Sequence, residues 1–398
     1  MSVKLFGKSL LQLRLYALRN EVIISYFQQF AGSKEGAQIG TRECMVRHCQ
    51  GTPGHCKVFD IFAAVKRIPS LDGLRAISIS LVLVGHWTSR HHELTFLSTY
   101  ANLGVRIFFV ISGYLITTLL LKEQENRGEI QLKRFYIRRA YRILPAAFAF
   151  VIPVIVLHRH ELSRWDVAAA MLYLMNFDFA TPWCVGHLWS LSVEEQFYFL
   201  WPGLLRKWFR HRSAILIGVV AVAPVYSAVC YFLKIPGGGY GTFPAVADNL
   251  AVGCLAAIFG TRIGTIRRSW VWLMMVVILL VPQFAANTPT RTLIMLFVLW
   301  PAMHFSIAGI LLCVVRQPFR FLNLEPVVFI GKISYSLYLW QQLFFFPPMP
   351  WPIYIALPAA FGCACLSYWF IEQPMLRLRE RERQEVTGET LCLSPAGD

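Results

Sequence analysis

The sequence predicts an all-α fold that crosses a lipid bilayer many times. Of its 398 residues, 56% are hydrophobic and 14% are aromatic. The apolar residues come in long blocks separated by short basic loops, which is the pattern of a polytopic helical membrane protein. Only helices and closed barrels satisfy backbone hydrogen bonds within lipid, and the sequence lacks the alternation of barrel strands.

Residues 1–66 differ in composition from the rest and carry no long apolar block. They lack the layout of a cleavable signal peptide. Their cysteines and histidines, between Cys44 and Cys56, follow no spacing typical of paired metal ligands, so we expect no metal site. We expect a poorly ordered cytoplasmic extension, or upstream sequence read from a wrong start codon.

About ten apolar stretches follow, each long enough to be a membrane span. They are residues 73–90, 102–121, 143–158, 187–205, 213–233, 243–260, 270–285, 292–315, 326–346 and 352–371. Residues 166–182 are also apolar, but counting them as a span breaks the charge pattern. We therefore expect a re-entrant or interfacial helix there.

Charge placement predicts the orientation of the spans. With both termini in the cytoplasm, the inside loops hold most lysines and arginines, including the runs 133–142 and 206–212. The outside loops hold few, so the positive-inside rule favours cytoplasmic termini. The net charge of +16 is thus explained by topology, and it does not indicate a nucleic-acid partner.

The first span carries two ionisable side chains, Arg75 near its start and His86 near its end. Eleven helical steps separate them by roughly 16 Å and about three turns, so both point to nearly the same side. That separation is about half of a hydrocarbon core roughly 30 Å thick. Ionisable groups at this depth usually face a polar cavity and are functional candidates. The alternative is that His86 only hydrogen-bonds a neighbouring helix.

The second span contains Ser112 and Gly113 in an apolar context. A small residue there lets another helix backbone approach closely, and the hydroxyl can bond across helices. A packing seam and a catalytic serine are both open, although no G-x-S-x-G turn surrounds the serine. Arg106 precedes this pair, and we expect it to snorkel to the outer interface.

Three arginines, Arg138, Arg139 and Arg142, lie beside the membrane before the third span. Two of them share a helical face, because residues three or four apart are neighbours on a helix. They are either the ordinary basic anchor of a cytoplasmic loop or a phosphate clamp, since guanidinium groups bind phosphate through two donors.

A pair of adjacent carboxylates, Glu194 and Glu195, lies inside an aromatic and apolar span. Carboxylates in such a place need a partner, a proton or water. Further polar groups gather at the outer end of this span: His187, Trp189 and Ser190. One carboxylate is expected to orient the imidazole of His86. The alternative is that one glutamate caps the helix and the other pairs with an arginine.

Six motifs in a fixed order carry a resemblance. They are LDGLRA, FFVISGYLIT, RFYIRRAYRILP, HLWSLSVEEQFYFLWP, ISYSLYLW and YWFIEQP, and they lie within residues 67–376. Their combination resembles the integral-membrane acyltransferase type 3 family, typified by bacterial sugar O-acetyltransferases. The resemblance implies transfer of an acyl group, usually acetyl from acetyl-CoA, to a hydroxyl of a cell-surface or exported glycan at the bacterial inner membrane.

The resemblance also implies roles for residues that match the motifs. The arginine and histidine of the first span, which the resemblance implies are essential, correspond to Arg75 and His86. The arginine cluster implied to contact the CoA phosphates corresponds to Arg138, Arg139 and Arg142. The serine–glycine and glutamate–glutamate pairs of the motifs correspond to Ser112–Gly113 and Glu194–Glu195. Gln341 departs from the pattern, because many members have histidine after YLW, which argues against a catalytic role at this position. Arg106 also departs, standing where an acidic residue is common.

The ends of the chain have no counterpart in these motifs. Residues 1–66 match none of them, and residues 377–398 form a charged cytoplasmic tail. Some members carry a C-terminal hydrolase-like domain, and we expect none here because so short a tail is far below the size of a domain.

The expected reaction is O-acylation with His86 as general base, because neutral imidazole has a suitable pKa near ~6.5. Glu194 or Glu195 would orient the imidazole, and direct transfer and a covalent acyl-histidine both remain open. Acetyl-CoA is the expected donor, and no metal is expected. The alternative is a transporter of an anionic or sugar substrate, which should show internal repeats, and the two halves of the sequence share no motif.

Overall fold

A computed structural model describes most of the residues between 68 and 379. The described residues are 68–89, 92–177, 182–235, 241–264, 266–284, 286–317, 319–345 and 351–379. Every regular element in these ranges is a helix, so the prediction of an all-helical fold is confirmed for them. The expectations for residues 1–66 fall outside the described residues, as do those for the tail from residue 380 onward.

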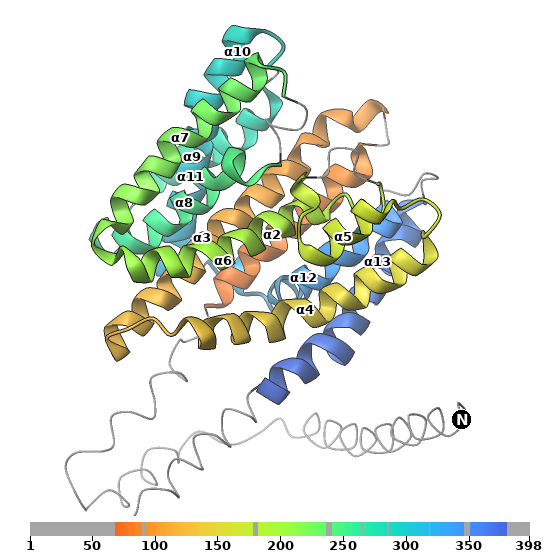
Figure 1. The fold of residues 1–398 in the computed structure, drawn as a ribbon. Helices are drawn as coiled ribbons and strands as arrows, with labels where there is room; N and C mark the ends of the chain where they lie inside the picture. Colours follow the sequence, from red (N-terminus) through yellow and green to blue (C-terminus); the bar gives the residue numbers. More distant parts are fainter. Residues whose placement is uncertain are drawn as a thin grey trace, which may run out of the picture. The chain divides into compact units, whose positions relative to one another are not determined.

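The long helices follow one another along the chain, and shorter helical elements lie between some of them (Figure 1). They are α2 (Pro69–Thr88), α3 (Thr99–Arg127), α4 (Leu132–Leu157), α6 (Leu188–Lys207), α7 (Arg212–Phe232), α8 (Phe243–Phe259), α9 (Arg268–Leu280), α11 (Trp300–Arg316), α12 (Glu325–Phe345) and α13 (Ile353–Ser367). Two π-helical segments extend α11 and α13 at one end: Met295–Leu299 precedes α11, and Tyr368–Glu372 (η8) follows α13. The shorter elements are η1 (His92–Leu97), α5 (Arg164–Leu172), η2 (Met175–Phe177), η3 (Phe209–His211), η4 (Gly260–Arg262), η5 (Val281–Gln283), α10 (Pro289–Ile294) and η7 (Phe321–Asn323).

A helix lies at each of the ten predicted stretches, and six helical segments are long and apolar enough to cross a membrane. The six are Glu93–Arg127, Leu132–Leu157, Phe209–Phe232, Phe243–Arg262, Pro289–Arg316 and Ile353–Arg379. Of the others, α9 is shorter, and α2, α6 and α12 carry charged or amide side chains within their apolar sequence. Ten crossings would require these four helices to cross as well.

The stretch 166–182 does not form a full span in its described part. It holds α5, a helix of nine residues, which is about 13 Å long and too short to cross the hydrocarbon core. A capping box between Ser163 and Asp166 fixes its start: Asp166 N–H donates to the serine hydroxyl at 3.1 Å, and Ser163 N–H donates to the carboxylate at 2.6 Å.

Helix α2 lies in the middle of the bundle, packed against α3 and α12 (Figure 1). Helix α3 also packs along α8, and α12 packs along α13. The side chains of α2 that lie deepest in the core, such as Ile79 and Val82, are fully buried. This central position explains why α2 tolerates polar side chains that a lipid-facing helix would not.

The seam between α3 and α8 depends on two glycines. A Cβ atom on Gly113 would collide with the carbonyl oxygen of Leu250, and one on Gly253 would collide with that of Val110. The two helix backbones are therefore in direct contact, as expected for small residues at a helix interface in a membrane. The packing role expected for the Ser112–Gly113 pair is thus present at the glycine.

We predict that Gly113→Ala destabilises the protein, because the added methyl group meets backbone that cannot move aside easily. Overpacking of this kind costs on the order of 1–3 kcal/mol. Thermal unfolding of the purified protein in detergent measures the effect. Gly203→Ala on α6 is the control, since nothing lies within 4 Å of its added Cβ. Equal unfolding midpoints for the two variants would contradict the close approach.

Candidate functional site

A partly open cavity of about 100 Å³ lies among α2, α3, α4, α6, α12 and the η8 segment after α13. Its charged lining comes from helices far apart in sequence: Arg75, Arg139, Arg142, Lys332, Glu194, Glu195 and Glu372. Tyrosine and serine hydroxyls complete the polar wall, among them Ser112, Ser190 and Tyr198. At about 100 Å³, the cavity therefore has room for a small group only.

Most of the residues singled out from the sequence meet at this cavity. Arg75, Ser112, Arg139, Arg142, Ser190, Glu194 and Glu195 all line it. Four of the predicted residues are not part of its wall: His86, Gly113, Arg138 and Trp189. The structure therefore separates the predicted set into a basic and acidic cavity and a histidine elsewhere on α2.

Glu194 is held by a hydroxyl chain that joins α3 and α6. Ser112 Oγ donates to Glu194 Oε1 at 2.7 Å, and Tyr198 OH donates to Ser112 Oγ at 3.1 Å. The Ser112 hydroxyl thus donates its hydrogen bond to a carboxylate, and its oxygen accepts a hydrogen bond from Tyr198. This arrangement suits a serine that orients Glu194 across the helix interface better than it suits a nucleophile.

The side chains of the three arginines of α4 do not all lie at the cavity. Arg139 lies over the ring of Tyr198, with its Cζ atom 5.2 Å from the ring centroid, and Arg142 joins it at the cavity. Arg138 instead points to α3, where its Nη2 lies 3.3 Å from the Oε2 of buried Glu123. Two of the three therefore face the cavity and the third does not, and the shared phosphate-binding role expected for all three stays a prediction.

Helix α2 and helix α12 complete the positive wall with Arg75 and Lys332. Arg75 is partly balanced on its own helix by Asp72, whose Oδ1 lies 3.8 Å from its Nη1. Four cationic side chains thus face one small polar space together with three carboxylates, and guanidinium groups pair with phosphate or carboxylate.

His86 lies near the other end of α2, and its Nδ1 is 2.8 Å from Oε1 of Gln341 on α12. An amide oxygen, and not a carboxylate, therefore lies beside this nitrogen, and the orienting role expected of Glu194 or Glu195 stays a prediction. Gln341 stands where many family members have histidine. In the structure its side chain is fully buried and in direct contact with His86, the candidate base.

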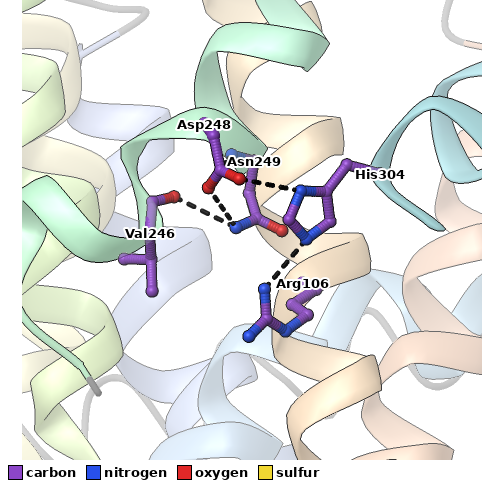
Figure 2. A network of polar contacts seen from close by, with 5 residues as sticks. All are labelled: Arg106, Val246, Asp248, Asn249 and His304. Atoms are coloured by element: carbon purple, nitrogen blue, oxygen red, sulfur yellow. Dashed lines mark hydrogen bonds and ion pairs between the residues drawn. The ribbon is translucent and has the colours of Figure 1, made fainter. Parts of the chain in front are cut away.

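A second polar network ties α3, α8 and α11 together away from the cavity (Figure 2). Arg106 Nη1 donates to His304 Nε2 at 2.9 Å, and His304 Nδ1 lies 3.0 Å from Asp248 Oδ2. The other carboxylate oxygen accepts from the backbone N–H of Asn249 at 2.9 Å. Arg106 also covers the ring of Trp300 at 4.3 Å.

This network corrects the expectation for Arg106. The side chain does not snorkel to the interface; it turns inward to a histidine that is fully buried. Sequence reasoning missed the network, although two signals were present: adjacent Asp248 and Asn249 in one apolar stretch and a lone His304 in another.

Residues 68–372 match the family described as an acyltransferase domain. The chain belongs to this acyltransferase family. With its six apolar helices it is a multi-pass membrane protein of the bacterial cell membrane, and the resemblance inferred from the ordered motifs is confirmed. No solved structure matches it.

Curated relatives of this acyltransferase are bacterial. It is 30% identical over 366 residues to the peptidoglycan O-acetyltransferase OatA of Listeria monocytogenes, covering 78% of this chain and 56% of the relative. It is 31% identical over 362 residues to the putative peptidoglycan O-acetyltransferase YrhL of Bacillus subtilis, covering 77% and 55%. The chain therefore spans about half the length of these relatives.

Several site residues of this acyltransferase were not predicted as functional. Lys332 and Glu372 line the cavity. The sequence feature that could have identified them is a charged residue inside or at the end of an apolar stretch. His187 is 5% exposed, and neither ring nitrogen has a well-oriented hydrogen-bond partner among the described residues. Its ring packs edge-on against Phe150, with centroids 5.4 Å apart.

We predict that the Arg106–His304–Asp248 network supports stability. His304→Ala leaves a buried carboxylate and a guanidinium without their shared partner, and breaking a buried pair from one side costs on the order of 3–5 kcal/mol. The thermal unfolding midpoint should fall markedly.

The control for this prediction is Glu129→Gln, which removes the ion pair with Arg206. That pair is 3.8 Å apart, and both side chains are at least half exposed, so its loss should change the midpoint little. An unchanged midpoint in His304→Ala would show that the network contributes nothing to stability.

Proposed function

We propose that this protein transfers an acetyl group from cytoplasmic acetyl-CoA to a hydroxyl of a cell-wall glycan outside the membrane. The observation that carries the proposal is the arrangement along α2: Arg75 lines a cavity of basic and acidic side chains, and His86 lies near the other end of the same helix. Relatives named as peptidoglycan O-acetyltransferases support a peptidoglycan-like acceptor.

The proposal includes ten crossings with both termini in the cytoplasm. Helices α2, α6, α9 and α12 would cross together with the six apolar segments, and residues 67–376 would form the membrane domain. The excess of arginine and lysine in alternate loops supports this orientation. It puts the Arg75 end of α2 toward the cytoplasm and His86 toward the outside.

The donor would bind from the cytoplasmic side. Arg139, Arg142, Arg75 and Lys332 supply the charge that phosphate groups of CoA need. CoA is far larger than the 100 Å³ cavity, so the nucleotide would lie outside it and the pantetheine arm would extend inward. The rise of roughly 16 Å along α2 from Arg75 to His86 is comparable to the reach of that extended arm.

The chemistry would centre on the imidazole of His86. As the acceptor hydroxyl attacks the thioester carbonyl, the imidazole takes its proton and the new C–O bond forms. The C–S bond then breaks, and the CoA thiolate leaves with the proton returned by the imidazolium. A covalent acyl-histidine would use the same nitrogen in two successive transfers. Glu194, fixed by Ser112, would lie beside the donor site.

His86→Ala should abolish acyl transfer while expression and membrane insertion survive. Loss of a general base lowers turnover on the order of 10²–10⁴-fold. Purified protein with labelled acetyl-CoA and a muropeptide or glycan acceptor measures it. His160→Ala, at an exposed loop position, is the control and should keep wild-type turnover. Near-normal turnover in His86→Ala would exclude the general-base role.

Replacement of the cavity arginines should weaken acetyl-CoA binding more than replacement of their neighbour. Arg139→Gln and Arg142→Gln each remove a charge-assisted contact worth on the order of 1.5–3 kcal/mol, or about tenfold or more in Kd. Arg138→Gln should change Kd less, because that side chain contacts Glu123. Calorimetric titration with acetyl-CoA measures all three, and equal effects would support the three-arginine clamp.

A further inference from the structure

A directed chain of hydrogen bonds runs from His86 into a loop on the far side of α12. His86 Nδ1 lies 2.8 Å from Gln341 Oε1, and Gln341 Nε2 donates to Gln342 Oε1 over 3.5 Å. Gln342 Nε2 in turn donates to the backbone carbonyl of Trp183. Both glutamines are buried, at 0% and 4% exposure, so this chain lies inside the protein.

The polarity of the chain is set at its far end. The carbonyl oxygen of Trp183 can only accept, so Gln342 must present its amide nitrogen there and its oxygen to Gln341. Gln341 then presents nitrogen to Gln342 and oxygen to His86. An amide oxygen is an acceptor, so Nδ1 of the imidazole must carry the proton, and Nε2 of the neutral ring is the unprotonated nitrogen.

The far end is itself held in place. Trp183 Nε1 donates to Glu161 Oε2 at 3.0 Å, and Glu161 Oε1 lies 2.9 Å from His158 Nδ1 at the end of α4. The ring of Trp183 packs edge-on against His158 at 5.1 Å. These two hydrogen bonds, first that from His158, lower the pKa of the Glu161 carboxyl. The loop that terminates the chain is therefore anchored by an ionised group.

We propose that Gln341 and Gln342 are positioning residues that hold His86 in its Nδ1–H tautomer, so that Nε2 is the nitrogen that takes the acceptor's proton. This inference rests on the proposed function for its catalytic meaning, but the tautomer itself is a property of the resting protein. A neutral amide fixes the ring without adding a negative charge, whereas a carboxylate in the same place would also favour the protonated imidazolium.

The tautomer can be observed without any substrate. Protein labelled with ¹⁵N-histidine, in lipid, gives ring-nitrogen shifts that distinguish protonated from unprotonated nitrogens, and the His86 signals are those lost in His86→Gln. The wild type should show a protonated Nδ1 and an unprotonated Nε2 at neutral pH. A wild-type His86 with the proton on Nε2 would overturn the proposal.

Substitutions test whether the hydrogen-bond chain through Gln341 and Gln342, here called the relay, sets the tautomer of His86 or only supports packing. Gln341→Leu and Gln342→Leu should each shift His86 toward a mixture of tautomers. Gln196→Leu is the matched control: its side chain is also in a membrane helix and donates to Asn176 and to the Tyr173 carbonyl, but it lies outside the chain. An unchanged His86 tautomer in both relay variants, or an equal change in the control, would refute the relay.

Kinetics then connect the tautomer to catalysis. Gln341→Leu should lower kcat about tenfold, as expected for loss of one orienting hydrogen bond, with KM for acetyl-CoA unchanged. Gln341→Glu restores an acceptor, so it should recover the Nδ1–H tautomer while moving the acid limb of the pH–rate profile to higher pH. A Gln341→Glu profile that superimposes on the wild type would contradict contact between residue 341 and the base.

One control assigns the pH shift to residue 341, and two possible outcomes separate this inference from the proposed function. His187, the residue before α6, is a second titratable side chain, and His86 acts on it electrostatically. The pH series is therefore repeated in His187→Phe to show that the shift belongs to residue 341. If the tautomer behaves as expected but no acyl transfer occurs with any acceptor, the relay stands and the proposed function fails. If transfer occurs but the tautomer is the other one, only the relay fails.

Discussion

A charged side chain within a bilayer must find a partner or a polar cavity, because an isolated ion in hydrocarbon is strongly disfavoured. This constraint arranges the bundle. The helices that carry internal charges, α2, α6 and α12, pack where their polar side chains meet one another. Apolar helices such as α7 and α13 instead expose large side chains, including Phe232 and Leu366, as expected for surfaces that face lipid.

The same constraint is satisfied in two different ways. Arg106, His304 and Asp248 lie side by side in a row of polar contacts that links three helices (Figure 2). Around Arg75 and Glu194 the charges instead surround a space of about 100 Å³. A network of paired side chains specifies how helices pack, whereas a cavity lined by four cations and three carboxylates leaves room for a ligand group. This difference is why we assign stability to the first and propose donor binding at the second.

The sequence predicted what depends on local periodicity and charge. Hydropathy located every long helix, and helical geometry placed Arg75 and His86 three turns apart on α2. It could not predict contacts that depend on how helices rotate against one another. Arg138 and Arg139 are adjacent in sequence, yet one meets Glu123 and the other lines the cavity. A hydrogen-bond partner of His86, Gln341, lies on α12, 255 residues away in sequence. Comparison of motifs alone showed only that Gln341 replaces a histidine, and it did not show that its amide contacts His86.

The central claim is that donor and acceptor approach from opposite sides of the membrane. Sealed vesicles of known orientation, with the acceptor glycan inside or outside, test it most directly. Labelled acetyl-CoA should support transfer only when it is presented to the face that carries Arg139 and Arg142, with the acceptor on the other face. Equal transfer with both substrates confined to that one face would contradict a reaction that spans the bilayer.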